Sequence, residues 1–323
     1  MKRIAYLSEV RNRALRPLDP DYDPSHPLSA AEDGFRHAPG TYDRILFLND
    51  VYFSPLAALQ LLFSTNLDPA AGRPSYQAAC AVDFIGYAMF YDTFVSRDLE
   101  GFGMGLMFFP WFTPSGKAES RQDALAGKDA VRVRSCWGGM IALQAAPFQR
   151  YPQSHELAVR GGMDVLRFRY EREIYWESAE CCLLLADLTA KYPPVDASRD
   201  TGIYINPFVR VAYKPVTYSW IPTITRFERI FAILQNIVSR IGYPEYNARR
   251  EELVGEEVER KVWVYDDEAK EAGTGVGAFR TVKSIATPGG FCGQKRLFVM
   301  LDIRNGTNKD GKKNWEKLPV PAD

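Results

Sequence analysis

Two apolar runs with a helix-like segment between them constrain the fold of this chain more than any other feature. Residues 44–48 read RILFL and residues 76–84 read YQAACAVDF, and such runs are typical of strands buried on both faces. Between them, Ser54 and Pro55 are suited to begin a helix reaching residue 63, because serine caps helix starts and proline fits the first turn. A strand, a helix and a second strand in this order predict a βαβ unit, and therefore an α/β sheet with parallel strands.

Hydrophobic spacing predicts further elements around this sheet. Helices are expected over residues 4–15, 178–191 and 225–241, and strands over residues 131–135 and 203–213. Ser178 is predicted to cap the second of these helices, and Gly242 to end the third. The proline-rich stretch 19–42 and the glycine- and aromatic-rich stretch 101–114 are expected to be loops, the latter close to a substrate.

The composition excludes some classes of function. The chain has 323 residues, of which 46% are hydrophobic, and this indicates a packed globular fold. The 40 Lys and Arg residues balance the 40 Asp and Glu residues, which argues against a nucleic-acid partner, since phosphate backbones require excess cations. Five cysteines and three histidines without a CxxC pair leave little for a zinc site, although one disulfide is possible.

The charge pattern divides the chain into two parts. Residues 1–242 are predicted to form one domain, and residues 243–323 a C-terminal extension with a charged tail and one ordered piece over residues 287–301. Residues 1–18 lack the pattern of a signal peptide, and the longest apolar stretches, 56–63 and 230–241, are too short to span a bilayer. We therefore expect no membrane segment in this chain.

Asn49 and Asp50 directly follow the first apolar run. An acid at the carboxyl end of a buried parallel strand lies in the crevice where open α/β sheets bind ligands, so Asp50 is a candidate metal ligand. Mg²⁺ and Mn²⁺ are the ions that one or two carboxylates and the phosphates of a ligand would hold. The alternative, which fits the two residues taken alone, is a turn in which both side chains satisfy backbone groups.

A second group of polar residues follows the strand that ends at Asp83. Asp92, Arg97, Asp98 and Glu100 stand beside the aromatic loop. Three acids and an arginine suit a polyhydroxylated ligand, because hydroxyls form paired hydrogen bonds, donating to carboxylates and accepting from a guanidinium, while rings cover the apolar face of a sugar. A surface turn with solvated ion pairs is the alternative.

Cys136 and Trp137 precede two glycines, Gly138 and Gly139. The neighbourhood of Cys136 resembles that of a papain-type nucleophile, but the spacing excludes this, since His155 is the only histidine downstream. Two glycines after a strand instead allow the backbone to approach a ligand closely, with Trp137 as a wall. A simple tight turn is the alternative.

Glu180 stands in the first turn of the helix predicted over residues 178–191. Its carboxylate could reach a ligand while Leu183 and Leu184 pack inward. The positive end of the helix dipole favours an acid there in any case, so a capping acid is the alternative that the position alone favours.

Eight sequence blocks, taken together, resemble the fungal cryptococcal mannosyltransferase 1 family, which is glycosyltransferase family 69 and includes capsule-associated proteins. In chain order the blocks read RNRALRPL, ILFLNDVYFSP, YQAACAVDF, FYDTFVSRDLEG, VRSCWGGMIAL, SAECCLLLADL, INPFVRVAY and PGGFCG. The resemblance covers most of residues 3–300. It implies a GT-A-like nucleotide-sugar-binding sheet flanked by helices, and transfer of mannose from GDP-mannose to a mannoside or glycan acceptor with Mn²⁺ or Mg²⁺. The implied linkage is α-1,3 and the implied stereochemistry is retaining.

The resemblance also assigns roles to residues. It implies that Asn49 and Asp50 take the place of a metal-binding Asp-X-Asp motif, and that Glu180 contacts the acceptor or the transferring sugar. Donor-binding residues, acceptor-binding residues and a further catalytic acid complete the implied site: Arg11, Asn12, Trp137, Gly138 and Gly139 for the donor, Asp92, Arg97 and Asp98 for the acceptor, and Asp83 as the acid. The other function class that fits is a catalytically inactive glycan-binding or scaffold protein on the same fold.

The chain departs from the family pattern in two respects. Family members usually begin with a membrane anchor and a first βαβ unit, and this chain is expected to lack both, which leaves the GT-A-like domain N-terminally incomplete. The resemblance implies the Golgi, whereas a chain that is complete without an anchor would be cytoplasmic. Asn49-Asp50-Val51 also supplies one carboxylate where two are common, so metal binding would depend on a further acid such as Asp83.

Overall fold

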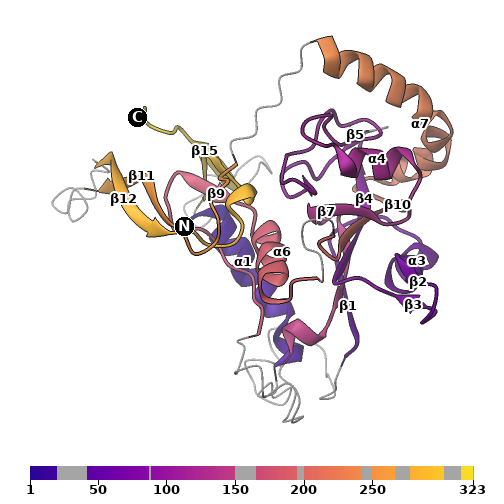
Figure 1. Ribbon diagram of the computed structural model, residues 1–323, viewed down its shortest axis with the longest axis horizontal. Coiled ribbons are helices and arrows are strands. Elements are labelled where there is room, and N and C mark those ends of the chain that lie inside the picture. The colour runs from indigo at the N-terminus through magenta and orange to yellow at the C-terminus, as the bar shows by residue number, and fades with distance from the viewer. Residues whose placement is uncertain are drawn as a thin grey trace.

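The structure of the chain is a computed structural model, and a mixed β-sheet forms its centre (Figure 1). It describes residues 1–19, 42–86, 89–149, 165–194, 200–241, 249–265, 277–301 and 314–322. The predicted loop over residues 19–42 lies almost entirely outside the described residues, and the predicted helix end at Gly242 lies outside them. The loop over residues 101–114 is irregular, as predicted, and contains a cis peptide bond before Pro110.

The central sheet has the strand order β1-β8-β4-β10-β7-β6, and β5 pairs with β4. β4 and β10 are parallel neighbours, while the other neighbouring pairs of this sheet are antiparallel. The strands are β1 (Arg44–Leu48), β4 (Ala78–Ile85), β5 (Met89–Phe90), β6 (Arg97–Asp98), β7 (Val131–Ser135), β8 (Met140–Gln144) and β10 (Ile203–Ala212). The α/β class is therefore confirmed, and the sheet is mixed where parallel strands were predicted.

The position of β1 differs from the prediction. β4 is buried from Ala78 to Phe84 as expected, but β1 is an edge strand, antiparallel to β8 and only partly buried. β8 lies between β1 and β4 and is antiparallel to both, so β1 and β4 still run in the same direction. A short apolar run predicts a buried strand, but it does not predict which strands pair with it. Here β8, from much later in the chain, lies between β1 and β4.

Helices cover both faces of the sheet. α3 (Pro55–Ser64) packs on one face, and Ser54 caps it as predicted by accepting a hydrogen bond from the Ala57 N–H at 3.0 Å. α6 (Glu180–Lys191) packs on the opposite face, with α1 (Arg3–Ala14) against it (Figure 1). The sheet is therefore the middle layer between two apolar cores.

Two helices begin elsewhere than predicted. α6 begins at Glu180 after Ala179, and Ser178, the predicted cap, is instead the last residue of β9 (Trp176–Ser178). α7 (Pro215–Ile241) starts well before residue 225 and continues through Pro222. The shorter elements are α4 (Glu119–Leu125), β2 (Leu67–Asp68), β3 (Arg73–Pro74) and the 3₁₀ helices η1 (Arg16–Leu18), η2 (Ala146–Phe148) and η3 (Gly290–Cys292). Within the described part of the chain, no helix is both long and apolar enough to cross a bilayer.

The C-terminal part of the chain contributes three small sheets. β11 (Glu257–Tyr265) and β12 (Gly277–Ile285) form a hairpin in a stretch that was predicted to be a charged extension. β13 (Gly293–Lys295) and β14 (Leu297–Met300) lie within the predicted ordered piece and pair with β9 and β15 (Trp315–Leu318), respectively. A bridge from Lys2 to Val299 joins this part to the N-terminus of the chain.

Two disulfides link distant elements, where the sequence indicated that one was possible. Cys80 of β4 is bonded to Cys136, which follows β7, and Cys182 of α6 is bonded to Cys292. Cys181 is buried and carries a free thiol. The second disulfide fixes the C-terminal segment to the helix that covers the sheet.

We expect the double variant Cys182→Ala/Cys292→Ala to lose about 2–4 kcal/mol of unfolding free energy, because its unfolded chain is no longer closed into a long loop. Cys181→Ala, at the adjacent buried cysteine without a disulfide, is the matched control and should lose less. Urea unfolding followed by circular dichroism measures both. Equal losses in the two variants would show that the bond contributes nothing beyond side-chain packing.

Candidate functional site

Polar side chains converge at the carboxyl ends of three strands. Asn49 follows β1, Asp83 lies near the end of β4 and Tyr213 follows β10. The Tyr213 hydroxyl donates a hydrogen bond to Asp83 Oδ2 at 3.0 Å. The chain after β1 crosses to β10, where the Tyr52 N–H donates to the Ala212 carbonyl at 2.7 Å. This crossing brings Asn49 to the edge of the sheet that carries Asp83 and Tyr213.

Gly138 and Gly139 pass against this edge at very short range. Both have a positive φ, of 57° and 67°, respectively. A Cβ on Gly138 would lie 1.9 Å from the Ala81 carbonyl oxygen, and one on Gly139 would lie 2.7 Å from Val51 Cγ1. The predicted close approach is thus an approach to the sheet itself, and only glycine fits at Gly138.

Asp83 and Asp92 form a pair of neighbouring carboxyl groups. Asp83 Oδ1 accepts the Asp92 N–H at 3.1 Å, and Asp92 Oδ2 accepts the Gly138 N–H at 3.0 Å. Burial raises the pKa of both carboxyls, and the negative charge of Asp83 raises the pKa of Asp92 further. Because two adjacent buried carboxylates repel each other, the pair favours a state that keeps one proton, as an acid–base group requires.

Arg11 enters the same region from α1. Its guanidinium Nη1 lies 2.6 Å from Glu180 Oε1, and the group stacks 4.6 Å from the centre of the Trp137 ring. Trp137 Nε1 donates to Asn49 Oδ1 at 3.2 Å. These contacts, together with those of Asp83 and Asp92, form what we call the edge network: Arg11, Asn49, Asp83, Asp92, Trp137, Gly138, Glu180 and Tyr213.

Most of the residues proposed from the sequence lie in or beside the edge network. Asn12 supports it, because its side chain donates to and accepts from the backbone of Phe168, whose ring packs on Trp137. Gly139 accepts the Asn49 N–H at 2.9 Å through its carbonyl. Asp50 is exposed next to Asn49, on the solvent side.

Arg97 and Asp98 form β6 and lie outside the edge network, although the charge of Asp92 acts on the Arg97 guanidinium. The Arg97 guanidinium donates to the carbonyls of Phe94, Ser96 and Phe291 at 2.8–2.9 Å. Asp98 Oδ1 accepts two backbone N–H groups, and burial raises the pKa of its carboxyl to about 6. The polar groups of both residues are occupied by backbone atoms.

Two tyrosines at this edge were not predicted from the sequence. Tyr213 links Asp83 to the network, and the Tyr91 ring packs edge-on against it with centroids 4.7 Å apart. Tyr91 is 48% exposed, as is Tyr52. Tyr213 is the last residue of the strand predicted over residues 203–213, so its position at a strand end was a usable signal.

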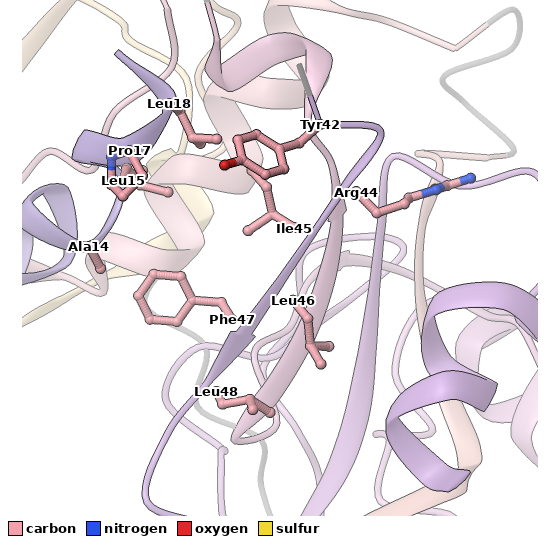
Figure 2. A pocket seen from close by; sticks show the side chains of 10 residues that line it. All are labelled: Ala14, Leu15, Pro17, Leu18, Tyr42, Arg44, Ile45, Leu46, Phe47 and Leu48. Atoms are coloured by element: carbon pink, nitrogen blue, oxygen red, sulfur yellow. The ribbon is translucent and has the colours of Figure 1, made fainter. Parts of the chain in front are cut away.

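An apolar pocket of about 420 Å³ lies behind the edge network, between the end of α1 and the edge strand β1 (Figure 2). Ile45, Phe47, Leu15 and Leu18 are among its lining side chains. The Phe47 ring also contacts the Trp137 ring, with centroids 5.2 Å apart. The pocket therefore shares a wall with the network and contributes apolar contacts, while the network holds the groups capable of proton transfer.

The charges of the network decide whether it suits a metal ion. Among the described residues, no three His, Cys, Asp or Glu side chains gather into a metal site. The network does bring together two carboxyl groups, Asp83 and Asp92, with the exposed Asp50 beside it. Its single guanidinium, Arg11, is already paired with Glu180. This donor set fits an ion such as Mg²⁺ that is shared with the phosphates of a ligand, because such ions use only one or two protein carboxylates.

The chain is thus an α/β protein with an acidic network at the carboxyl ends of its strands, the edge at which open α/β sheets bind their ligands. A family model described as cryptococcal mannosyltransferase 1 matches residues 1–187, more than half of the chain. The chain therefore belongs to the cryptococcal mannosyltransferase 1 family, as the sequence blocks predicted. No curated protein and no solved structure matches it. The matched region contains the edge network except Tyr213.

Gly138→Ala should destabilise the protein far more than Gly127→Ala. Both glycines have a positive φ, and an alanine in that conformation costs about 1–2 kcal/mol. At Gly127 a Cβ meets no atom within 4 Å, whereas at Gly138 it collides with β4, and such overpacking adds about 1–3 kcal/mol or more. Chemical denaturation of the two variants measures the difference, and equal losses would contradict the close approach.

Asp92→Asn should flatten the dependence of stability on pH. Because burial and the charge of Asp83 raise the pKa of Asp92 to about 8, the folded state binds more protons than the unfolded state between about pH 4 and about pH 8, so stability falls as the pH rises through this range. An asparagine still accepts the Gly138 N–H but does not titrate. The urea midpoint should fall less steeply with rising pH in this variant than in wild type. The control is Asp50→Asn, at an exposed position. A variant that keeps the wild-type slope would exclude Asp92 as the source.

Proposed function

We propose that this protein transfers mannose from GDP-mannose to a mannoside or glycan acceptor, with an α-1,3 linkage, on a GT-A-like sheet. Family membership supports a mannosyltransferase at the level of the reaction class. The observation that carries the proposal is the edge network, because it joins segments from α1, β1, β4, the turn after β7, α6 and β10 in one place. That place is the edge where open α/β sheets bind ligands.

In this proposal, the donor lies across Arg11 and Trp137. Glu180 acts as a positioning residue, since its ion pair holds Arg11 over the Trp137 ring. The guanidinium side chain is 17% exposed, so part of it faces the solvent and can meet the donor. Tyr91, which is exposed beside Tyr213, supplies a ring for the apolar face of a sugar.

The carboxyl pair supplies acid–base chemistry in this scheme. As the bond between the mannose C1 and the phosphate oxygen breaks, the acceptor oxygen bonds to C1, and its proton must leave. Asp92 takes that proton in the state in which its own carboxyl is ionised, because it is less buried than Asp83 and its raised pKa makes it the stronger base of the pair. Asp83, held by the Tyr213 hydroxyl, keeps the backbone of Asp92 in place.

A divalent ion, Mn²⁺ or Mg²⁺, belongs to the proposal for a reason of charge. A diphosphate approaching this edge meets the exposed carboxyl of Asp50 and the negative charge of the Asp83 and Asp92 pair, while Arg11 is partly neutralised by Glu180. When bound, the ion neutralises the charge that develops on the departing nucleotide. Asp50, exposed beside Asn49, is the side chain that would hold it from the protein.

The two disulfides support a site of action in the Golgi lumen. Disulfides persist in oxidising compartments and are rare in the cytosol, where thiols are kept reduced. Both bonds join elements that are far apart in the sequence, by 56 and 110 residues. They are therefore part of how the fold is held together.

A catalytically inactive glycan-binding protein is the second candidate function. The observation that favours it is burial, since Asp83 is 0% and Glu180 3% exposed. A network this buried could serve only to hold the edge of the sheet in shape. Exposed aromatic rings such as Tyr52 and Tyr91 would then bind the glycan without any transfer.

We expect the purified chain to release GDP from GDP-mannose when Mn²⁺ and an α-mannoside are present. Asp50→Ala should abolish the response to the metal, and Asp92→Asn should lower the rate by about 10²-fold or more, as loss of a general base does. Glu259→Gln, at an exposed acid of β11, is the control and should retain the activity.

Calorimetry separates the two candidate functions. Failure to bind GDP-mannose at millimolar concentration would contradict the transferase. If the same protein still bound an immobilised mannan, the glycan-binding function would replace it. Donor binding that survives Asp50→Ala unchanged would remove that residue from the metal site.

A further inference from the structure

α7 turns its polar side chains toward the rest of the protein. Thr217, Glu228 and Gln235 are buried, each on the side of the helix that faces the fold. Glu228 pairs with Arg210 of β10, with Oε2 2.8 Å from Nη2, and Gln235 accepts a hydrogen bond from Arg121. Ile221 and Tyr218 pack into the core near the start of α7, but from Glu228 onward the buried contacts are polar, which is the reverse of an ordinary amphipathic helix on a soluble domain.

Most of the large apolar side chains of α7 face outward instead. From Phe227 onward they recur every three or four residues, so they share one face of the helix. We call this face the α7 stripe; its residues, each 47–62% exposed, are Val216, Trp220, Phe227, Ile230, Ile233, Leu234, Ile237 and Val238. Figure 1 shows this part of α7 at the periphery of the molecule, away from the small sheets of the C-terminal part. A contiguous apolar surface of this kind marks an interaction site.

The stripe continues onto a neighbouring loop. The Phe108 ring stacks on the Phe231 ring of α7, with centroids 5.7 Å apart, and is itself 37% exposed. Met107 beside it is 40% exposed. The apolar surface therefore extends beyond a single helix and includes the loop between β6 and α4.

The charges next to the stripe are positive. Lys214, Arg226 and Arg229 are exposed on or just before α7. Glu228, the only acid in residues 215–241, is buried in its pair with Arg210. A helix with large apolar side chains on one face and exposed basic residues is typical of segments that lie in the headgroup region of anionic membranes.

We propose that the α7 stripe docks the protein onto the surface of an anionic lipid bilayer, with the helix lying parallel to the membrane plane. A second copy of the chain fits less well, because packing two stripes together would bring the basic residues of both copies near each other. α7 begins just after Tyr213, so docking would place the edge network close to the membrane surface. The proposal rests on the stripe and its charges and does not depend on mannosyl transfer.

Vesicle co-sedimentation tests this docking. Wild-type protein should bind vesicles of phosphatidylcholine and phosphatidylserine, and binding to phosphatidylcholine alone should be much weaker. Ile230→Asn/Leu234→Asn should weaken the binding about tenfold or more, because it removes apolar area from the headgroup region. The matched control is Leu56→Asn/Leu59→Asn on α3, where the two leucines are 74% and 53% exposed, and it should bind like wild type.

A charge variant tests the same surface without removing apolar groups. Arg226→Glu/Arg229→Glu should weaken binding to the anionic vesicles by at least about fivefold for each residue, the effect expected of a basic residue near such a surface. Urea midpoints close to that of wild type confirm that the variants are folded. If the asparagine variant does not fold, the charge variant still tests the proposal, because its substitutions are at exposed positions.

Three results would overturn the proposal. The first is no binding of wild-type protein to the anionic vesicles. The second is equal binding by the α7 and α3 variants, which would show that the stripe is not the contact. The third is a wild-type dimer, seen by light scattering, that becomes a monomer in Ile230→Asn/Leu234→Asn while vesicle binding is unchanged, which would make a second copy the occupant of the stripe.

Discussion

The contact between Gly138 and β4 is the constraint on which the arrangement of the site depends. No side chain fits between Gly138 and the Ala81 carbonyl, so the turn after β7 lies directly on the sheet. The disulfide from Cys80 to Cys136 fixes the start of this turn to the same strand. Only at this range can the Gly138 N–H reach Asp92 and the Trp137 ring reach both Arg11 and Asn49. A larger residue at position 138 would move the turn that carries Trp137 and Gly138 away from the sheet, and so away from Asp83 and Asp92.

The network gathers more negative than positive groups, and this shapes what it can bind. Burying Asp83 and Asp92 together is costly unless one keeps a proton or a cation is nearby. Hydrogen bonds from Tyr213 and Gly138 lower this cost but do not remove it. Arg11 lowers the pKa of Asp92 but does not balance the pair by itself, because Glu180 already shares its charge. The same imbalance makes a cation-assisted phosphate ligand a better match for this edge than a free anion.

Features that depend on local sequence were predictable, and features set by distant pairing were not. The burial of β4, the start of α3 and its Ser54 cap follow from short patterns, and the structure confirms them. The edge position of β1 depends on β8, which joins the sheet from much later in the chain. Asp83 and Asp92 stood out as separate acids, but their pairing and the part of Tyr213 required the folded sheet. Arg97, a plausible sugar ligand by composition, is instead occupied by backbone carbonyls.

α7 shows why an amphipathic pattern does not determine its own orientation. The spacing of residues 225–241 predicts that one face is apolar, yet it does not say which face meets the protein. Glu228 and Gln235 settle this, because a carboxylate and an amide buried against Arg210 and Arg121 are satisfied only in one orientation of the helix. Once these polar contacts turn inward, the large apolar side chains must face outward, where water is a poor environment for them. The polar attachment and the exposed stripe are therefore two consequences of the same choice of helix face.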